Sequence, residues 1–559
     1  MVFEERRRNG ACDSISEFLI FEQLKFRVQT DDRDPQLRTI IHLGLLLGFV
    51  AAGLGCVTPT LEGRRSAAIK DLTSAAMRTP GPPERVVLIT VSGLESSDFL
   101  NAFGHAASGS DEVRMPNLAR LAREGAIGVH AHPPSPSSVY SSHATLATGL
   151  LPARHGVIAD LALDREGNRA LPFWDSRLLK GTALWDAAIA RGVLALGWPT
   201  TVGARIELVV PDGEPSDTER TWLEFIATRT SPQLMRGLQS IAALAVEDKE
   251  RDPKPWPTPE EKDAAFVELA CRVASSERDP GLWLIRLNQT ANFQRSAGFG
   301  SVEVDAALAR IDAEIGRLMD CLEAAGRVTS TAIFVTGDVA YRAVHTQIDP
   351  NVILVREGLV GRDPRSTLGV RSWLALVRSN GRSAFVYARD AASALEARRW
   401  LEQEATRTGA YEVVPASELA ASGGDPQAWF GLAAKPGFAF GNGLSNPAVR
   451  PSEIRGSAGA FPFRDPQETS VGFVAWGRGI RPQVRVPSLY LSDVAPTIAT
   501  LLGLRLDPEL DGEAMVGILR AAVPIKPLPG PKQLGIGSDG DVDRALRELG
   551  GGREIGRDE

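Results

Sequence analysis

The stretch PPSPSSVYSSHATLATGLLPARHG, residues 133–156, indicates how the rest of the chain is organised. A loop rich in Ser and Pro leads into a short run of small residues, 143–149, that predicts a helix ending at Gly149. The N-terminus of such a helix offers free backbone N–H groups and a positive dipole end, which suit a nucleophile or a bound phosphate or sulfate. Before it, the apolar run RVVLITV at 85–91 predicts a buried strand, and MPNLARLAREG at 115–125 predicts an amphipathic helix.

These segments resemble the alkaline phosphatase superfamily, and most closely its type I phosphodiesterase/nucleotide pyrophosphatase branch. In that branch the first strand ends in an Asp-Gly whose Asp binds metal, and a Thr-x-Pro-x-His-x-Thr segment carries the Thr nucleophile. This chain has Ser92 at the Asp position. Alignment on His143, Thr145 and Gly149 places Val139 at the nucleophile position, and a Val side chain cannot attack phosphorus.

The family's remaining ligand motifs are also altered. The resemblance implies metal ligands at the two ends of an Asp-x-x-x-His segment, where this chain has Asn288 and Asn292. It implies Asp and His ligands in a Ser-Asp-His-Gly segment, where the chain has Asp338 and Val339, and a last His where it has Ala458. Of the six ligand positions, Asp338 alone keeps the family residue.

The resemblance implies hydrolysis of phosphodiester or phosphonate-like bonds with two divalent metals, Zn or Mn. Neutral Asn and Ser oxygens do not offset the dehydration of a divalent cation, so we expect no bound metal pair and a non-catalytic binding protein. Asp338 would instead accept hydrogen bonds from Ser92, Asn288 or Asn292.

An active enzyme with a rebuilt site is the alternative hypothesis. A one-residue shift of register would make Ser138 the nucleophile, and Ser141 is the second candidate. One metal would then be held by Asp338, Asn288 and Asn292.

The histidines are interpreted first as structural. His143 and His155 are in frame with scaffold positions of the motif and are expected to form hydrogen bonds. His105, His130 and His132 would form a new metal site only if the fold gathers them.

The overall pattern predicts the α/β class. From residue 84 to 518, apolar strands alternate with amphipathic helices, which favours an α/β/α sandwich around a mostly parallel sheet. Together with the family resemblance, this pattern predicts that the sandwich carries cap insertions near 205–280 and 365–435. A Pro- and Gly-rich segment, 519–559, predicts a disordered tail.

The N-terminal residues 1–57 are interpreted as a leader. Its uncharged run 40–57 resembles a bacterial lipoprotein signal with Cys56 as the lipidated residue, and 58–83 would be a tether. A single membrane-anchoring helix and a buried core helix are the alternatives. We therefore expect a membrane-tethered protein on the extracytoplasmic face of the cell envelope, most simply in a bacterial periplasm.

The charge and cysteine content of the chain limit the classes of partner that it can bind. The net charge is −7 and no basic stripe is present, which argues against nucleic acid. An anionic ligand or a protein partner is expected, and a purely structural envelope component is a further option. The four cysteines show no CxxC spacing, so neither a zinc site nor a disulfide framework is predicted, and Cys271 and Cys321 are interpreted as buried apolar residues.

Overall fold

The computed structural model describes residues 81–101, 114–163, 170–213, 221–241, 257–363, 369–445, 447–464 and 466–520. All belong to one compact unit that spans 73–559. The predicted leader with Cys56, nearly all of the tether and most of the predicted tail lie outside the described residues. Within the described ranges, none of the helices combines the length and the apolar character needed to span a bilayer.

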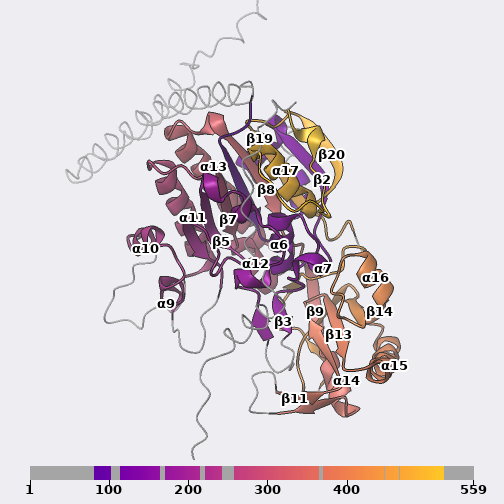
Figure 1. Ribbon diagram of the computed structural model, residues 1–559. Helices are drawn as coiled ribbons and strands as arrows, with labels where there is room; N and C mark the ends of the chain where they lie inside the picture. Colours follow the sequence, from indigo (N-terminus) through magenta and orange to yellow (C-terminus); the bar gives the residue numbers. More distant parts are fainter. Residues whose placement is uncertain are drawn as a thin grey trace, which may run out of the picture. The chain divides into compact units, whose positions relative to one another are not determined.

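An eight-stranded sheet forms the centre of the fold, in the order β20-β2-β19-β8-β1-β7-β5-β6 (Figure 1). Strand β19 runs antiparallel to both of its neighbours, and the other neighbouring pairs are parallel. The strands are β1 (Arg85–Val91), β2 (Ala126–His132), β5 (Val193–Trp198), β6 (Leu208–Pro211), β7 (Leu282–Leu287), β8 (Thr331–Gly337), β19 (Val471–Gly477) and β20 (Val484–Tyr490).

Helices cover both faces of this sheet because the side chains of a strand alternate between its faces. In β1, Val87, Ile89 and Val91 join a core with residues of α5 (Pro116–Glu124), α11 (Pro259–Ala274) and α13 (Val302–Ala324). The alternate residues Val86 and Leu88 join a second core with α6 (Val139–Thr148), α8 (Leu184–Ala187) and α17 (Val494–Leu502). The predicted α/β/α sandwich with a mostly parallel sheet is thus confirmed.

The described part of the segment 205–280 belongs to this sandwich. Strand β6 is an edge strand of the main sheet, and α11 covers one of its faces. Helices α9 (Trp222–Ala227) and α10 (Pro232–Gln239) contribute buried residues to the same core. The segment therefore continues the sheet and its helical layer instead of forming the expected cap, because its apolar residues are buried against the core.

The segment 365–435 forms a separate small sheet. Four antiparallel strands follow the order β12-β13-β15-β14, with bounds Ala375–Ser379, Ser383–Ala388, Phe430–Ala434 and Tyr411–Pro415. Helix α15 (Ala391–Thr408) packs on this sheet through Ala397 and Leu401.

Shorter elements complete the described chain. Strands β16 (Gly437–Phe440), β9 (Arg342–Ile348), β17 (Val449–Pro451) and β18 (Gly456–Ser457) form one small sheet, and β10 (Val360–Arg362) with β11 (Val370–Trp373) and β3 (Leu161–Leu163) with β4 (Ala170–Pro172) form two hairpins. The other helices are α7 (Pro152–His155), α12 (Gln289–Ser296), α14 (Pro350–Arg356) and α16 (Ala416–Ala421), with 3₁₀ turns at Ser176–Leu178, Ile189–Arg191, Val328–Ser330, Leu491–Asp493 and Val516–Ile518.

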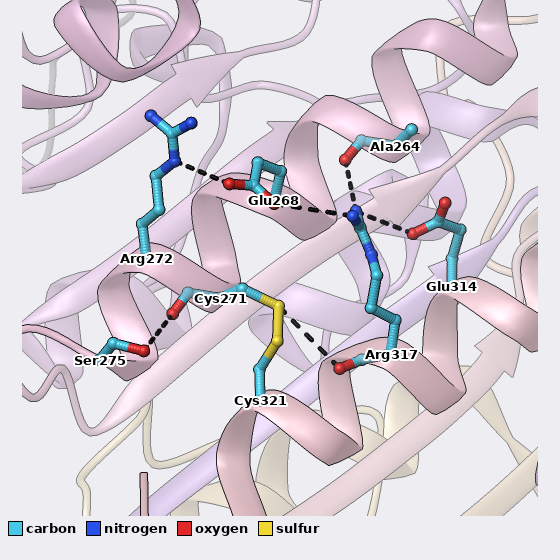
Figure 2. The surroundings of a disulfide bond; sticks show 8 residues. All are labelled: Ala264, Glu268, Cys271, Arg272, Ser275, Glu314, Arg317 and Cys321. Carbon is cyan, nitrogen blue, oxygen red and sulfur yellow. Dashed lines mark hydrogen bonds and ion pairs between the residues drawn. A yellow bond between two sulfur atoms is a disulfide. The ribbon is translucent and has the colours of Figure 1, made fainter. Parts of the chain in front are cut away.

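A disulfide joins Cys271 of α11 to Cys321 of α13 (Figure 2). The interpretation of these cysteines as unpaired buried residues is therefore wrong. The two helices pack side by side and bring the Cα atoms to 5.3 Å, although 50 residues separate them in sequence. Spacing rules for short motifs do not detect a pair that a helix–helix contact creates. Glu268 of α11 forms ion pairs with Arg272 of the same helix and with Arg317 of α13 (Figure 2).

Candidate functional site

The polar family positions meet at the carboxyl ends of three neighbouring strands. Val91 at the end of β1 is in register with Leu287 of β7 and Gly337 of β8. The next residue on each strand is Ser92, Asn288 and Asp338, respectively. Ligands of α/β sheets bind beyond such strand ends, so the sheet register places these three side chains where a site is expected.

Asp338 is fully buried and accepts three hydrogen bonds. They come from Ser92 Oγ at 2.7 Å, from the Gly93 amide at 3.2 Å and from the Val339 amide at 2.7 Å. The expected bond from Ser92 is therefore present. Burial raises the pKa of the Asp338 carboxyl, while the Arg286 guanidinium and these hydrogen bonds act in the opposite direction.

The cation of the site is Arg286, which the sequence reasoning missed. Its Nε donates to Ser92 Oγ at 3.2 Å, and its Nη2 donates to Asn288 Oδ1 at 3.0 Å. Its Nη1 forms an ion pair with Asp212 at 3.1 Å, and the Arg286 side chain is 9% exposed. Burial by itself would lower the pKa of Arg286, but the carboxylates of Asp212 and Asp338 raise it above its ordinary value. A signal was available, because Arg286 is the one charged residue in the run GLWLIRL.

Two further side chains extend the network from Asp212, which directly follows β6. The Tyr140 hydroxyl donates to Asp212 Oδ2 at 2.9 Å, and the Tyr140 amide donates to Asp160 at 2.9 Å. We call the connected set the polar network; it consists of Ser92, Tyr140, Asp160, Asp212, Arg286, Asn288 and Asp338.

Asp263 of α11 fixes the segment that follows β7. Its carboxylate accepts hydrogen bonds from the backbone amides of Asn288 and Gln289 at 2.9–3.0 Å. These amides lie at the start of α12, where free N–H groups and the helix dipole favour a negative charge. Burial nevertheless raises the pKa of Asp263 to about 7, against these hydrogen bonds and the nearby Arg286.

The other replaced family positions form an apolar cluster. Val339, Ala291 and Tyr341 are buried together, and the half-buried Val139 and Ala458 pack against them. The residues that the resemblance places at the nucleophile position and at two ligand positions therefore belong to one apolar cluster. Asn292 does not join either group, because its side chain is exposed on α12.

The two serines considered as nucleophiles are buried and bonded to each other. Ser138 is the N-cap residue of α6, and its hydroxyl lies 2.8 Å from the Ser141 hydroxyl. The Ser141 hydroxyl also lies 2.9 Å from the Pro136 carbonyl and is 0% exposed. This is a helix-capping arrangement, which occupies the hydroxyls that catalysis would need.

His143 and His155 are fully buried and hydrogen-bonded, as expected of scaffold residues. His143 Nε2 lies 2.8 Å from Thr90 Oγ1, and its Nδ1 lies 2.7 Å from the Val139 carbonyl. His155 Nε2 lies 3.0 Å from Thr145 Oγ1. Burial lowers the pKa of each ring to about 3, so both are neutral at physiological pH.

The residues at the family positions do not fit a two-metal centre. Asp338 supplies the one carboxylate among the six ligand positions, and a guanidinium already neutralises its surroundings. In the part of the chain that the structure describes, no group of three or more His, Cys, Asp or Glu side chains is arranged to hold a metal. Of His105, His130 and His132, the fold brings the last two together on strand β2, and His105 lies outside the described residues.

Comparisons with known proteins agree with this fold. The structure is similar to that of human ectonucleotide pyrophosphatase/phosphodiesterase 5, with a TM-score of 0.54 and 15% identity over 78% of this chain and 100% of that chain. Two structures of the murine protein, one an inactive variant in complex with AMP, give a TM-score of 0.52 and 15% identity over 76% of this chain and 96% of theirs. A search of curated proteins found no match.

The likeness to these structures shows a shared fold, and the match to a family model is more specific. The model described as type I phosphodiesterase/nucleotide pyrophosphatase matches residues 86–457, which is more than half of the chain. The matched range contains all of the strand ends that carry the polar network. The chain therefore belongs to the type I phosphodiesterase/nucleotide pyrophosphatase family, within the alkaline phosphatase superfamily.

Proposed function

We propose that this chain is a non-catalytic member of its family that acts as an exported binding protein. The observation that carries the proposal is the position of Arg286, whose guanidinium contacts Ser92 and Asn288, two former ligand positions, at once. A fixed guanidinium repels a divalent cation and supplies the positive charge that Asp338 requires in a buried setting.

The charge distribution favours a protein partner over an anionic ligand. The Arg286 guanidinium is already engaged by Asp212 and by the oxygens of Ser92 and Asn288. An anion that approached it would have to displace these partners and would meet the carboxylates of Asp212 and Asp338. A neutral surface can instead pack on the half-buried Val139 and Ala458.

Export is supported by the disulfide and by the leader. Disulfides persist in oxidising compartments and are rare in the cytosol, so the Cys271–Cys321 bond favours an extracytoplasmic location. We propose lipidation at Cys56 as the anchor, with a membrane helix over 40–57 as the alternative. Mass spectrometry of the mature N-terminus distinguishes a diacylglyceryl-Cys56 start from an unprocessed chain.

The catalytic part of the proposal is tested by elemental analysis of metal content and by hydrolysis of bis-p-nitrophenyl phosphate with added zinc, manganese or magnesium. We expect the wild-type protein to hydrolyse the substrate no faster than the Asp338→Ala variant does. We also expect the two proteins to contain the same amount of metal. About two bound metals together with turnover that Asp338→Ala abolishes would contradict the proposal. A folded protein, judged by circular dichroism, is required in both samples.

A further inference from the structure

Two histidines of strand β2 lie on the same face, away from the polar network. His130 and His132 are two residues apart, and the side chains of such a pair point to one side of a strand. Their ring centroids are 6.3 Å apart, with 23° between the ring planes. Both side chains are half-buried, so both rings remain accessible to solvent. Strands β19 and β8 separate β2 from β1, and hence from the family site.

Hydroxyl groups of two neighbouring segments surround the pair. Ser488 and Tyr490 on the edge strand β20 are in register with His130 and His132. His132 Nε2 lies 3.1 Å from Ser488 Oγ, and His130 Nδ1 lies 3.5 Å from Ser470 Oγ. The Tyr490 ring, which is 60% exposed, lies 5.5 Å from the His132 ring.

A backbone hydrogen bond to Pro466 orients the His132 ring. Burial and the neighbouring His130 lower the pKa of His132, whereas the hydrogen bond from the ring to the backbone of Pro466 acts in the opposite direction. A neutral imidazole that donates one N–H to a carbonyl keeps a lone pair on its other nitrogen. This is the arrangement in which histidines bind metals, with the donated hydrogen bond fixing the ring.

We propose that His130 and His132 form a binding site for a divalent transition metal of the zinc or copper class. Imidazole nitrogens suit these metals, whereas hard cations prefer oxygen ligands. With a metal about 2.0–2.1 Å from one nitrogen of each ring, two ring centroids lie roughly 5–6.5 Å apart. The observed separation of 6.3 Å falls within this range. Since no third His, Cys, Asp or Glu of the described residues joins the pair, water or the Ser488 hydroxyl completes the coordination.

The test is a titration of the full chain, purified with a tag that lacks histidine and stripped of metal, with Zn²⁺ in a calorimeter. We expect one site with a dissociation constant in the micromolar range. Either His130→Gln or His132→Gln weakens zinc binding at least tenfold. The double variant loses no more affinity than the single variant with the larger loss. His345→Gln, which alters an exposed histidine on β9, is the matched control and leaves the affinity unchanged.

Zinc binding that is equally strong in the double variant overturns the proposal, as does the absence of binding at millimolar Zn²⁺. A Gln variant is not used if it lowers the melting temperature without metal. In that case, electron paramagnetic resonance of Cu²⁺ bound to the wild-type protein identifies the ligands. Hyperfine splitting from two imidazole nitrogens supports the pair, and a spectrum without nitrogen ligands overturns it.

Discussion

Arg286 and Ser92 are in direct contact, with Arg286 Nε donating to Ser92 Oγ at 3.2 Å, and Ser92 in turn donates to Asp338 at 2.7 Å. A side-chain cation therefore lies beside Asp338, the one carboxylate among the six positions that the family resemblance implies as ligands. Ser92 is compatible with this cation, because its hydroxyl can accept from the guanidinium and donate to the carboxylate at the same time.

Removing the guanidinium should destabilise the fold. Arg286→Met leaves Asp338 and Asp212 without their buried cation, and we expect a loss of about 3 kcal/mol in the free energy of unfolding. Urea denaturation followed by circular dichroism measures it. The variant that combines Arg286→Met with Asp212→Asn should lose less, because one unpaired charge is removed with the cation. A loss below about 0.5 kcal/mol for Arg286→Met, the level of an ordinary surface change, would argue against a central role of the guanidinium.

Restoring the family ligands should not restore metal binding while Arg286 is present. The restored variant carries Ser92→Asp, Val139→Thr, Asn288→Asp, Asn292→His, Val339→His and Ala458→His. We expect it to bind zinc at these positions only when Arg286→Met is added, because the cation repels the metal and competes for the same oxygens. Metal content measured on both proteins, each confirmed as folded, makes the comparison. Two zinc ions in the protein that keeps Arg286 would show that the guanidinium does not block the site.

The buried carboxyl of Asp263 should make stability fall as pH rises. Its pKa is raised to about 7 in the folded protein from an ordinary value of 3.8. The folded state therefore holds this proton over a pH range in which the unfolded state has released it, and stability declines by about 1.4 kcal/mol per pH unit between the two values. Relative to Asp263→Asn, which keeps one carbonyl acceptor, the wild type should lose stability from about pH 4 to pH 7 and remain level above. Parallel stability curves for the two proteins would contradict this assignment.

The buried neutral histidines should instead make the free energy of unfolding decrease as the pH falls. The pKa of His155 is about 3 in the folded protein against an ordinary 6.5, so the unfolded state gains a proton first as pH falls. The stability that the neutral ring contributes is complete above pH 6.5 and is lost progressively toward pH 3. We expect the wild type to weaken over this range relative to His155→Gln. Unfolding in urea at half-unit pH steps measures the difference, and equal pH slopes would exclude a buried neutral His155.

The disulfide should stabilise the pairing of α11 with α13. Cys271 and Cys321 close a loop of 50 residues, for which the loop-entropy relation gives about 4 kcal/mol. The Cys271→Ala, Cys321→Ala variant should unfold at a correspondingly lower urea concentration. Dithiothreitol should lower the midpoint of the wild type and leave that of the variant unchanged. An unchanged wild-type midpoint under reduction, with both thiols shown to be free, would contradict the prediction.

Much of the fold follows from the sequence because local patterns determine it. The run at 85–91 is apolar except at Arg85 and Thr90, which is the pattern expected of a strand covered on both faces. Strand β1 is indeed buried throughout. The alignment of Val139, Val339 and Ala458 with family site positions rests on motif spacing and stays a prediction. The segment 205–280 was harder, since its polar linkers conceal the apolar face that α11 buries.

The sequence by itself determined the fold class and the family, because strand and helix periodicity and motif spacing are local properties of the chain. The tertiary structure alone decided which side chains meet at the strand ends. Arg286 is bonded to Ser92 and Asn288 because parallel register aligns the ends of β1 and β7, and it pairs with Asp212 because β6 extends the same sheet. The disulfide between Cys271 and Cys321 likewise joins distant segments. So does the apolar cluster that contains Val339, against which Val139 and Ala458 pack. Such contacts arise only when the core packs, so no local pattern could reveal them.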